Sequence, residues 1–158
     1  MQITVEPIGH VSCTRAEAVD DAWDSESASI QLAERFGAES LLGLSEFSHV
    51  EVVYCFHGVT PHGVVTGARH PRGNSAWPLV GIFAQRAKNR PNRLATTLCR
   101  LLRVEATRLS IAGLDAIDGT PVLDIKPVMA EFLPRGVVVQ PKWSHELMAG
   151  YWSRGRAE

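Results

Sequence analysis

The 158-residue sequence has no apolar run that approaches the roughly 20 residues of a membrane-spanning helix. Its first residues, Met1–Pro7, lack the basic start and the apolar stretch of a secretory signal peptide. These two absences predict a cytoplasmic protein without a membrane anchor. Hydrophobic residues make up 45% of the chain and charged residues 21%, so the composition is that of an ordinary globular protein, and the length suits one domain.

Cysteine is scarce, because only Cys13, Cys55 and Cys99 occur and no two of them form a C-x-x-C motif. An odd number of widely spaced cysteines argues against a disulfide framework and against a zinc site. Cys55 and Cys99 lie in apolar runs, which predicts buried thiols that pack as small hydrophobic groups. The aspartates between residues 115 and 124 have no histidine or cysteine beside them, so we predict no metal site.

The best-known nucleotide and catalytic motifs are also missing. The sequence has no G-x-G-x-x-G, no G-x-x-x-x-G-K-[ST], no H-E-x-x-H and no G-x-S-x-G. A nucleotide cofactor, if the chain binds one, must therefore be held in another way.

Charge is unevenly distributed, although the net charge is only −1. Residues 16–34 contain six acidic residues and no lysine or arginine, whereas residues 86–108 contain seven basic residues and one acidic residue. A basic face of this kind can attract an anionic partner such as nucleic acid. An ordinary solvated surface with offsetting charges would have the same composition, so both interpretations stay open.

Short apolar runs separated by turn residues predict a single mainly-β domain, a barrel or sandwich with short peripheral helices, over residues 1–152. Residues 153–158 are expected to form a frayed tail. Strands are expected at 3–11, 28–32, 50–56, 108–112 and 122–125. Helices are expected at 34–44 and 143–152, a long loop at 58–78, and either state at 96–104.

Two polar segments are candidates for chemistry. In residues 81–93 an apolar run leads directly into arginines and amides, and guanidinium groups bind carboxylate or phosphate as planar forks. A solvated basic loop is the alternative. Residues 112–127 contain a strong turn signal at 118–121, followed by Asp124 and Lys126, which share a face if this segment is a strand. An internal ion pair is the plainer explanation for these last two residues.

Several segments together resemble the TrmO (TsaA-like) family of tRNA-modifying enzymes. The resemblance covers residues 8–127, about three quarters of the chain, and its last two motifs are highly specific in combination. The motifs that carry it are Ser45–His49, Phe56–His57, Gly81–Arg86, Arg90–Asn92 and Leu114–Pro127. The resemblance implies a β-barrel that binds S-adenosylmethionine at or near a homodimer interface. It also implies N6-methylation of a threonylcarbamoyl-adenosine next to a tRNA anticodon.

The cofactor positions of the family fall on residues of four separate segments. They are Phe56, His57, Arg86, Ala95, Thr96, Ala112, Gly113, Leu114 and Asp115. On chemical grounds, Arg86 suits the carboxylate of the cofactor, Asp115 suits its ammonium group, and a turn at Gly113 suits its polar atoms. His57 could instead be a buried histidine with internal partners.

Roles in substrate binding and catalysis are assigned from residue chemistry. The acceptor nitrogen must lose a proton, and Asp118 or His57 is the candidate proton acceptor. The candidate substrate contacts are Arg90, Asn92, Arg93 and Lys126.

The sequence departs from the family in three places. It lacks a Pro-Arg-Gln loop upstream of Phe47, and the acidic stretch 20–26 stands there instead, so Trp23 is a candidate to stack on adenine or to bind a cation. Ala95 replaces a glycine, and the tryptophans near the C-terminus do not match the family. Two alternatives therefore stay open: a methyltransferase with another small-molecule or nucleic-acid acceptor, and a non-catalytic barrel that binds S-adenosylmethionine or RNA.

Overall fold

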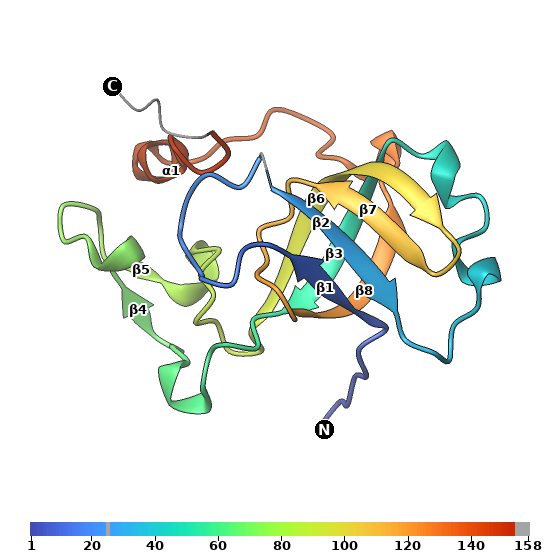
Figure 1. Cartoon of the computed structure of the whole chain (residues 1–158). Helices are drawn as coiled ribbons and strands as arrows, with labels where there is room; N and C mark the ends of the chain where they lie inside the picture. The colour runs from blue at the N-terminus through green and yellow to red at the C-terminus, as the bar shows by residue number, and fades with distance from the viewer. Residues whose placement is uncertain (25, 154–158) are drawn as a thin grey trace.

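The structure is a computed structural model that describes residues 1–24 and 26–153 (Figure 1). Six antiparallel strands close into a barrel in the order β1-β2-β7-β6-β3-β8. They are β1 (Gly9–Cys13), β2 (Ser27–Leu32), β3 (His49–Cys55), β6 (Leu94–Glu105), β7 (Arg108–Ala112) and β8 (Pro121–Pro127). The prediction of a mainly-β barrel is confirmed. Except for Ser153, the predicted tail lies outside the described residues.

Alternating side chains fill the barrel, because successive residues of a strand point to opposite faces of the sheet. On β3, Val50, Val52 and Tyr54 are fully buried, whereas the residues between them are partly exposed. Leu109 and Ile111 of β7 face the same core. Alternation predicts the strand at 108–112, whereas β-branched and aromatic residues predict the one at 50–56.

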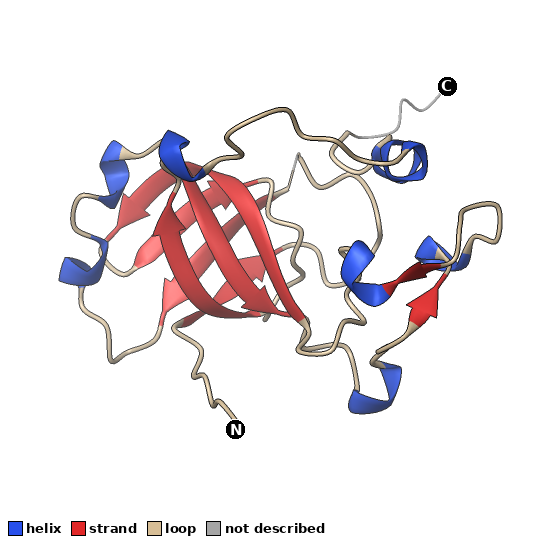
Figure 2. Ribbon diagram, turned by 180° about the vertical axis from the view of Figure 1, so that it is seen from behind, coloured by secondary structure: helices blue, strands red, loops and turns tan. Residues whose placement is uncertain are grey.

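Short elements surround the barrel at two opposite ends (Figures 1 and 2). The 3-10 helices η1 (Ala38–Leu41) and η2 (Leu44–Glu46) cover one end. Beyond the other end lie the strands β4 (Ala68–Arg69) and β5 (Val80–Gly81), the 3-10 helices η3 (Pro61–Gly63), η4 (Pro71–Gly73) and η5 (Ile82–Ala84), and the helix α1 (Lys142–Met148). A further 3-10 helix, η6 (Ala130–Phe132), follows β8. No helix of the described residues has the length and apolar character needed to cross a membrane.

Four expectations about the elements need correction. The predicted helix at 34–44 is wrong, because Gly43 takes φ = 82° and divides the segment into two 3-10 helices. The first strand begins at Gly9 rather than at residue 3, since Pro7 lacks the N–H that a strand ladder needs. The long loop contains β4, and the C-terminal helix ends at Met148, two residues before Gly150. The ambiguous segment 96–104 lies within β6.

The cysteine prediction is confirmed for one thiol. Cys99 is fully buried, and this burial raises the pKa of its thiol to about 12. Cys55 is only partly buried. Cys99 therefore packs as a small apolar group and stays protonated at neutral pH.

Candidate cofactor-binding site

Two segments from distant parts of the chain run side by side at the end of the barrel near α1. We call residues 20–24 and 150–152 the strap. The backbone N–H groups of Ala22, Trp23 and Asp24 donate to the carbonyl oxygens of residues 150, 151 and 152 at 3.2, 3.0 and 3.0 Å. The strap thus holds the C-terminal aromatic residues beside the acidic stretch.

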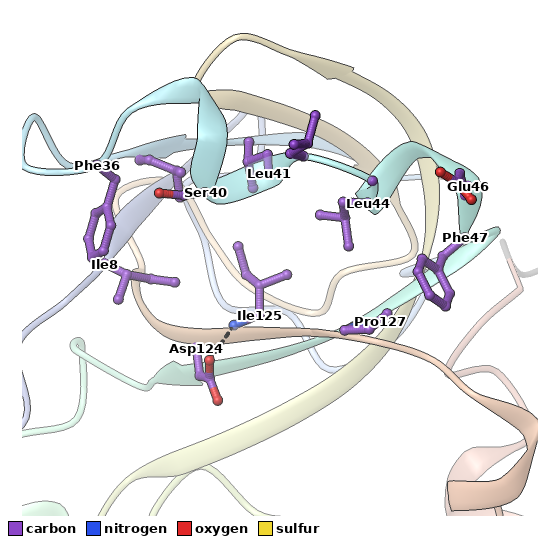
Figure 3. Close-up of a pocket in the computed structure, with 13 residues that line it drawn as sticks. Ile8, Phe36, Ser40, Leu41, Leu44, Glu46, Phe47, Asp124, Ile125 and Pro127 are labelled. Atoms are coloured by element: carbon purple, nitrogen blue, oxygen red, sulfur yellow. Dashed lines mark hydrogen bonds between the residues drawn. The ribbon is translucent and has the colours of Figure 1, made fainter.

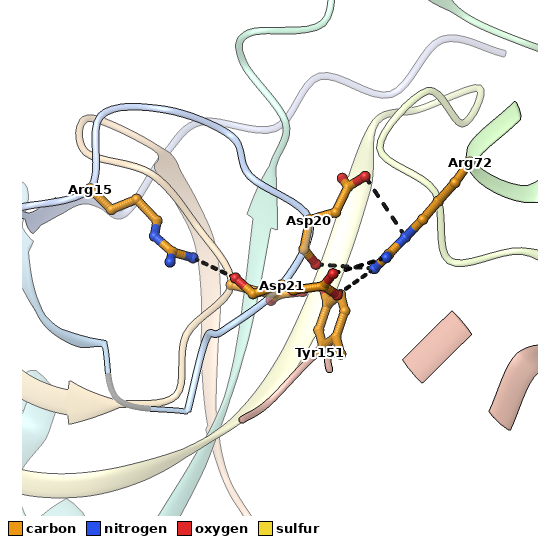
Figure 4. A network of polar contacts seen from close by, with 6 residues as sticks. Arg15, Asp20, Asp21, Arg72 and Tyr151 are labelled. Atoms are coloured by element: carbon orange, nitrogen blue, oxygen red, sulfur yellow. Dashed lines mark hydrogen bonds and ion pairs between the residues drawn. The ribbon is translucent and has the colours of Figure 1, made fainter. Parts of the chain in front are cut away.

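Ion pairs connect the strap to the loop that contains β4 and β5 (Figure 4). The Arg72 guanidinium lies 2.8 Å from an Asp21 carboxylate oxygen and 3.7 Å from one of Asp20. The hydrogen bond from Arg72 to Asp21 raises the pKa of the guanidinium. From the same loop, the Trp77 indole N–H donates to Glu146 of α1 at 2.9 Å. These contacts hold the loop, α1 and the strap together at one end of the barrel.

Trp23 lies inside the strap and is only 4% exposed. The Arg15 guanidinium stacks 4.0 Å from its ring centroid and donates to the carbonyl oxygens of Asp21 and Ala22. Trp23 therefore contacts a cation, but the cation is a residue of this chain. A contact between Trp23 and a cofactor stays a prediction.

Below the strap, the Asp115 carboxylate accepts hydrogen bonds from three hydroxyl groups. Tyr54, Thr97 and Tyr151 donate them, and Tyr54 and Thr97 are buried. Burial, and then the negative charge of Asp115, raise the pKa values of the Tyr54 and Tyr151 phenols. Both phenols therefore stay neutral donors, and Asp115 is fixed at the end of the barrel.

Arg86 faces this same end of the barrel. Its guanidinium donates to the carbonyl oxygen of Thr96 at 2.7 Å, one residue before the Thr97 hydroxyl that binds Asp115. The positive charge of Arg86 also acts on the Tyr151 phenol, where it partly opposes the rise in pKa. The monomer thus brings the predicted Arg86 and Asp115 positions together.

A polar cavity of about 370 Å³ lies on the outer face of the barrel beside the strap. Its wall consists of Asp24, His49, Leu98, Arg100, Ala112, Gly113 and Trp152. Strand register explains part of this set, because His49 of β3 is paired with Arg100 of β6, which is paired with Ala112 of β7. Two of the predicted cofactor residues, Ala112 and Gly113, therefore line a cavity of ligand size.

The Gly113 turn closes one side of this cavity. Gly113 takes φ = 79°, which favours glycine, and its N–H donates to the carbonyl oxygen of Glu26 at 3.0 Å. A Cβ at this position would lie 4.0 Å from a carboxylate oxygen of Asp24. The positive φ of Gly113 fits the turn that we considered at this position on chemical grounds.

Two arginines of the segment 81–93 bond to the backbone of this chain. Arg90 donates to the carbonyl oxygen of Gln85 at 3.2 Å, and Arg93 donates to that of Val59 at 2.7 Å. Arg93 takes a positive φ of 54°, whereas Ala95, which replaces a glycine of the family, lies in β6 opposite Tyr54. A guanidinium has five N–H donors, so both arginines keep donors for a phosphate, and that role stays a prediction.

The other predicted residues lie around the barrel rather than in the polar cavity. Phe56 packs edge-on against Tyr54 at 5.5 Å, and the neighbouring His57 is exposed. Asp118 accepts the Cys13 N–H at 3.0 Å at the turn before β8. Leu114 is buried in the core, Asn92 is exposed, and Lys126 forms an exposed ion pair with Asp124.

A second cavity, of about 600 Å³, lies at the opposite end beside η1 and η2 (Figure 3). Apolar side chains such as Phe36, Leu41 and Ile125 form most of its wall, and Glu46 and Asp124 are its charged residues. It contains none of the predicted cofactor residues. A charged sulfonium nucleoside needs polar partners, so the smaller, polar cavity is the candidate site.

The segment that contains most of this site is similar to known proteins. Residues 18–132 match the family described as tRNA-methyltransferase O N-terminal domain, and they include the Gly113 turn and Asp115. The chain belongs to this family. A crystal structure of TrmO from Pseudomonas aeruginosa superposes with a TM-score of 0.73 and 29% identity, covering 90% of this chain and 62% of that one.

Two curated proteins are also similar in sequence to this chain, which is a TrmO family member. A human tRNA (adenine(37)-N6)-methyltransferase is 40% identical over 102 residues, which are 65% of this chain and 23% of the human protein. A Pseudomonas aeruginosa protein named putative S-adenosylmethionine-dependent methyltransferase RcsF is 34% identical over 144 residues, 85% of this chain and 59% of that protein. The chain thus spans less than two thirds of the length of these relatives.

Sequence reasoning missed several residues of the polar cavity wall. His49 belongs to a motif that we matched to the TrmO family, but the motif alone does not show which way the imidazole points. Arg100 has no motif and reaches the site through strand register, and Trp152 reaches it through the hydrogen bonds of the strap. Among the described residues, no group of three or more His, Cys, Asp or Glu side chains is placed to hold a metal ion.

Proposed function

We propose that this chain binds S-adenosylmethionine in the polar cavity and methylates the N6 atom of an adenosine in tRNA. The finer substrate is a threonylcarbamoyl-adenosine next to the anticodon, and such an enzyme would work in the cytoplasm. The observation that carries the proposal is the cavity beside the Gly113 turn, in a chain that belongs to the TrmO family.

The residues of the cavity fit the chemical groups of this cofactor. Arg100 and Asp24 place opposite charges in one wall, as a ligand with both an ammonium and a carboxylate group requires. The Trp152 indole, 40% exposed, offers an apolar face for a purine ring. Arg86 and Asp115 do not line the cavity, but they supply a second pair of opposite charges at the end of the barrel near the strap. The cofactor would contribute a methyl group on a sulfonium, which is an activated leaving group.

The remaining work of the chain is alignment, because an in-line displacement depends on the relative position of its two reactants. Gly113 of the cavity wall is fixed by the hydrogen bond from its N–H to Glu26, and Asp115, two residues further along the chain, is held by three hydroxyl groups, so this segment is rigid. Asp24 and Trp152 of the strap form part of the cavity wall. His57 or Asp118 stays the predicted proton acceptor from sequence.

Charge and exposed apolar groups support the proposed partners. Arg100 and Arg103 of β6 are exposed and can attract a polyanion such as tRNA. Leu94, Leu98 and Leu102 are spaced four residues apart on β6, and each is at least 40% exposed. Leu98 also lines the polar cavity, so a second copy packed on these leucines would contact the wall of the site. This arrangement supports a homodimer.

One assay tests the methyltransferase proposal. The protein is incubated with methyl-labelled S-adenosylmethionine and tRNA that lacks the modification, and the labelled nucleoside is identified after digestion. We expect N6-methylated adenosine, and we expect Arg100→Ala to reduce its rate at least about tenfold. The matched control is Arg108→Ala, which changes an exposed arginine of β7 outside the cavity. Cofactor binding without label in tRNA would contradict the tRNA assignment.

A different acceptor is favoured by one observation. Asp24 lines the cavity and would repel phosphate, whereas the charges of Asp20 and Asp21 in the strap are offset by Arg72. A small or cationic acceptor would suit this charge better. Label that appears in small molecules of a cell extract, and not in tRNA, would support this alternative.

A further inference from the structure

His49 lines the polar cavity, whereas the two predicted proton acceptors, His57 and Asp118, do not. Within the part of the chain that the structure describes, it is the only histidine in the wall of the polar cavity. Its backbone is fixed, because its carbonyl oxygen accepts the N–H of Val128 at 3.0 Å and its residue pairs with Arg100 across the sheet. His57 and Asp118 line neither of the two cavities described above.

The imidazole ring of His49 is oriented by the residue before it. The Ser48 hydroxyl oxygen lies 2.8 Å from Nδ1 of His49. A ring that donates its Nδ1–H to this oxygen has its lone pair at Nε2, which is the atom free to accept a proton. The same serine oxygen can stabilise the imidazolium ion, because Nδ1–H remains a donor after Nε2 is protonated.

We propose that Nε2 of His49 accepts the proton that the adenine nitrogen loses on methylation, an inference that rests on the proposed function. The nitrogen forms a bond to the methyl carbon while the carbon–sulfur bond breaks, and the electrons of that bond stay on sulfur as a neutral thioether. The N–H electrons return to nitrogen as its proton moves to His49 Nε2. Water then takes the proton from the imidazolium ion, so the enzyme returns to its starting state.

Other charged groups near His49 can influence how the rate depends on pH. Arg100 of β6 and Asp24 of the strap share the cavity wall with it. Glu51, two residues along β3, is paired with Lys126 of β8 on the same outer face. Glu46 of η2 belongs to the wall of the apolar cavity. Imidazole generally changes charge between about pH 5 and 8, so a rate that depends on an imidazole proton acceptor is expected to change in this range.

The test compares methyl transfer by His49→Gln with that of the wild type from pH 5 to 9. We expect kcat to fall about 100-fold, with the Kd for S-adenosylmethionine within about twofold of the wild type. The wild-type rate should decline at low pH as the imidazole becomes protonated, and His49→Gln should lack this decline. Added imidazole should restore part of the activity of His49→Ala. Ser48→Ala should lower kcat severalfold.

A matched control and distinct outcomes separate this inference from the proposed function. His10→Gln changes an exposed histidine of β1 and should keep the wild-type rate and pH profile. The inference is overturned if His49→Gln keeps its rate and low-pH decline, or if only His57→Gln or Asp118→Asn removes that decline. A wild-type protein that methylates no acceptor would instead overturn the proposed function, and the inference with it.

Discussion

Replacement of Asp115 with alanine is expected to lower the free energy of unfolding by about 3–4 kcal/mol. The carboxylate accepts hydrogen bonds from Tyr54, Thr97 and Tyr151, and two of these hydroxyls are buried. Without the carboxylate, the buried hydroxyls lose an acceptor that water cannot easily replace. A hydrogen bond to a charged group contributes roughly 1.5–3 kcal/mol, and the three bonds share one acceptor, so their effects do not add fully.

Urea unfolding followed by circular dichroism measures this loss. Asp118→Ala is the control, because its exposed carboxylate accepts the N–H of Cys13, and we expect a loss of about 1 kcal/mol there. Equal losses for the two variants would show that the hydroxyl cluster does not stabilise the barrel. A large loss for Asp115→Ala alone would establish it as the polar anchor of the site.

High pH is expected to destabilise the protein through the buried phenol of Tyr54. Burial, and then the charge of Asp115, raise its pKa in the folded state above the ordinary value near 10. The folded protein therefore holds this proton more tightly than the unfolded chain. The stabilisation is fully present below about pH 10 and is lost as pH rises, at about 1.4 kcal/mol per pH unit, or about 3 kcal/mol by pH 12.

Three other groups act in the same direction, among them Cys13, whose thiol pKa is raised by burial. The Cys99 thiol, with its pKa raised to about 12 by burial, begins to contribute near pH 9, and the half-exposed Tyr151 contributes less than Tyr54. Unfolding free energies measured from pH 8 to 12 should decrease with a steeper slope above pH 10. Tyr54→Phe should reduce the slope of unfolding free energy against pH by about 1.4 kcal/mol per pH unit, which is the contribution of one proton. An unchanged slope in this variant would show that the phenol ionises freely in the folded protein.

The barrel was predictable because most of its strands carry strong local patterns. Residues 108–112 alternate and form β7 with those bounds, and the turn signal at 118–121 is confirmed by Gly119 at φ = 74°. The segment 34–44 misled the prediction, since its apolar spacing suits a helix but Gly43 ends any regular turn. Local propensity alone could not show that this segment forms two 3-10 helices over a cavity.

The candidate site was predictable only in part, for a physical reason. Ala112 and Gly113 follow each other in one motif, so the sequence shows them together. His49 and Arg100 become neighbours through cross-strand register, which no single segment contains. Trp152 meets Asp24 through backbone hydrogen bonds between the two halves of the strap, so the aromatic residue in the cavity wall is Trp152, while Trp23 stacks on Arg15.

Calorimetric titration with S-adenosylmethionine tests most directly whether the polar cavity is the cofactor site. We expect the wild type to bind, and Arg100→Ala and Trp152→Ala each to raise the Kd about tenfold. Leu42→Ala, in the wall of the apolar cavity, should leave the Kd within about twofold. Absence of binding by the wild type, or a Kd that changes with Leu42→Ala and not with the other two variants, would contradict this account.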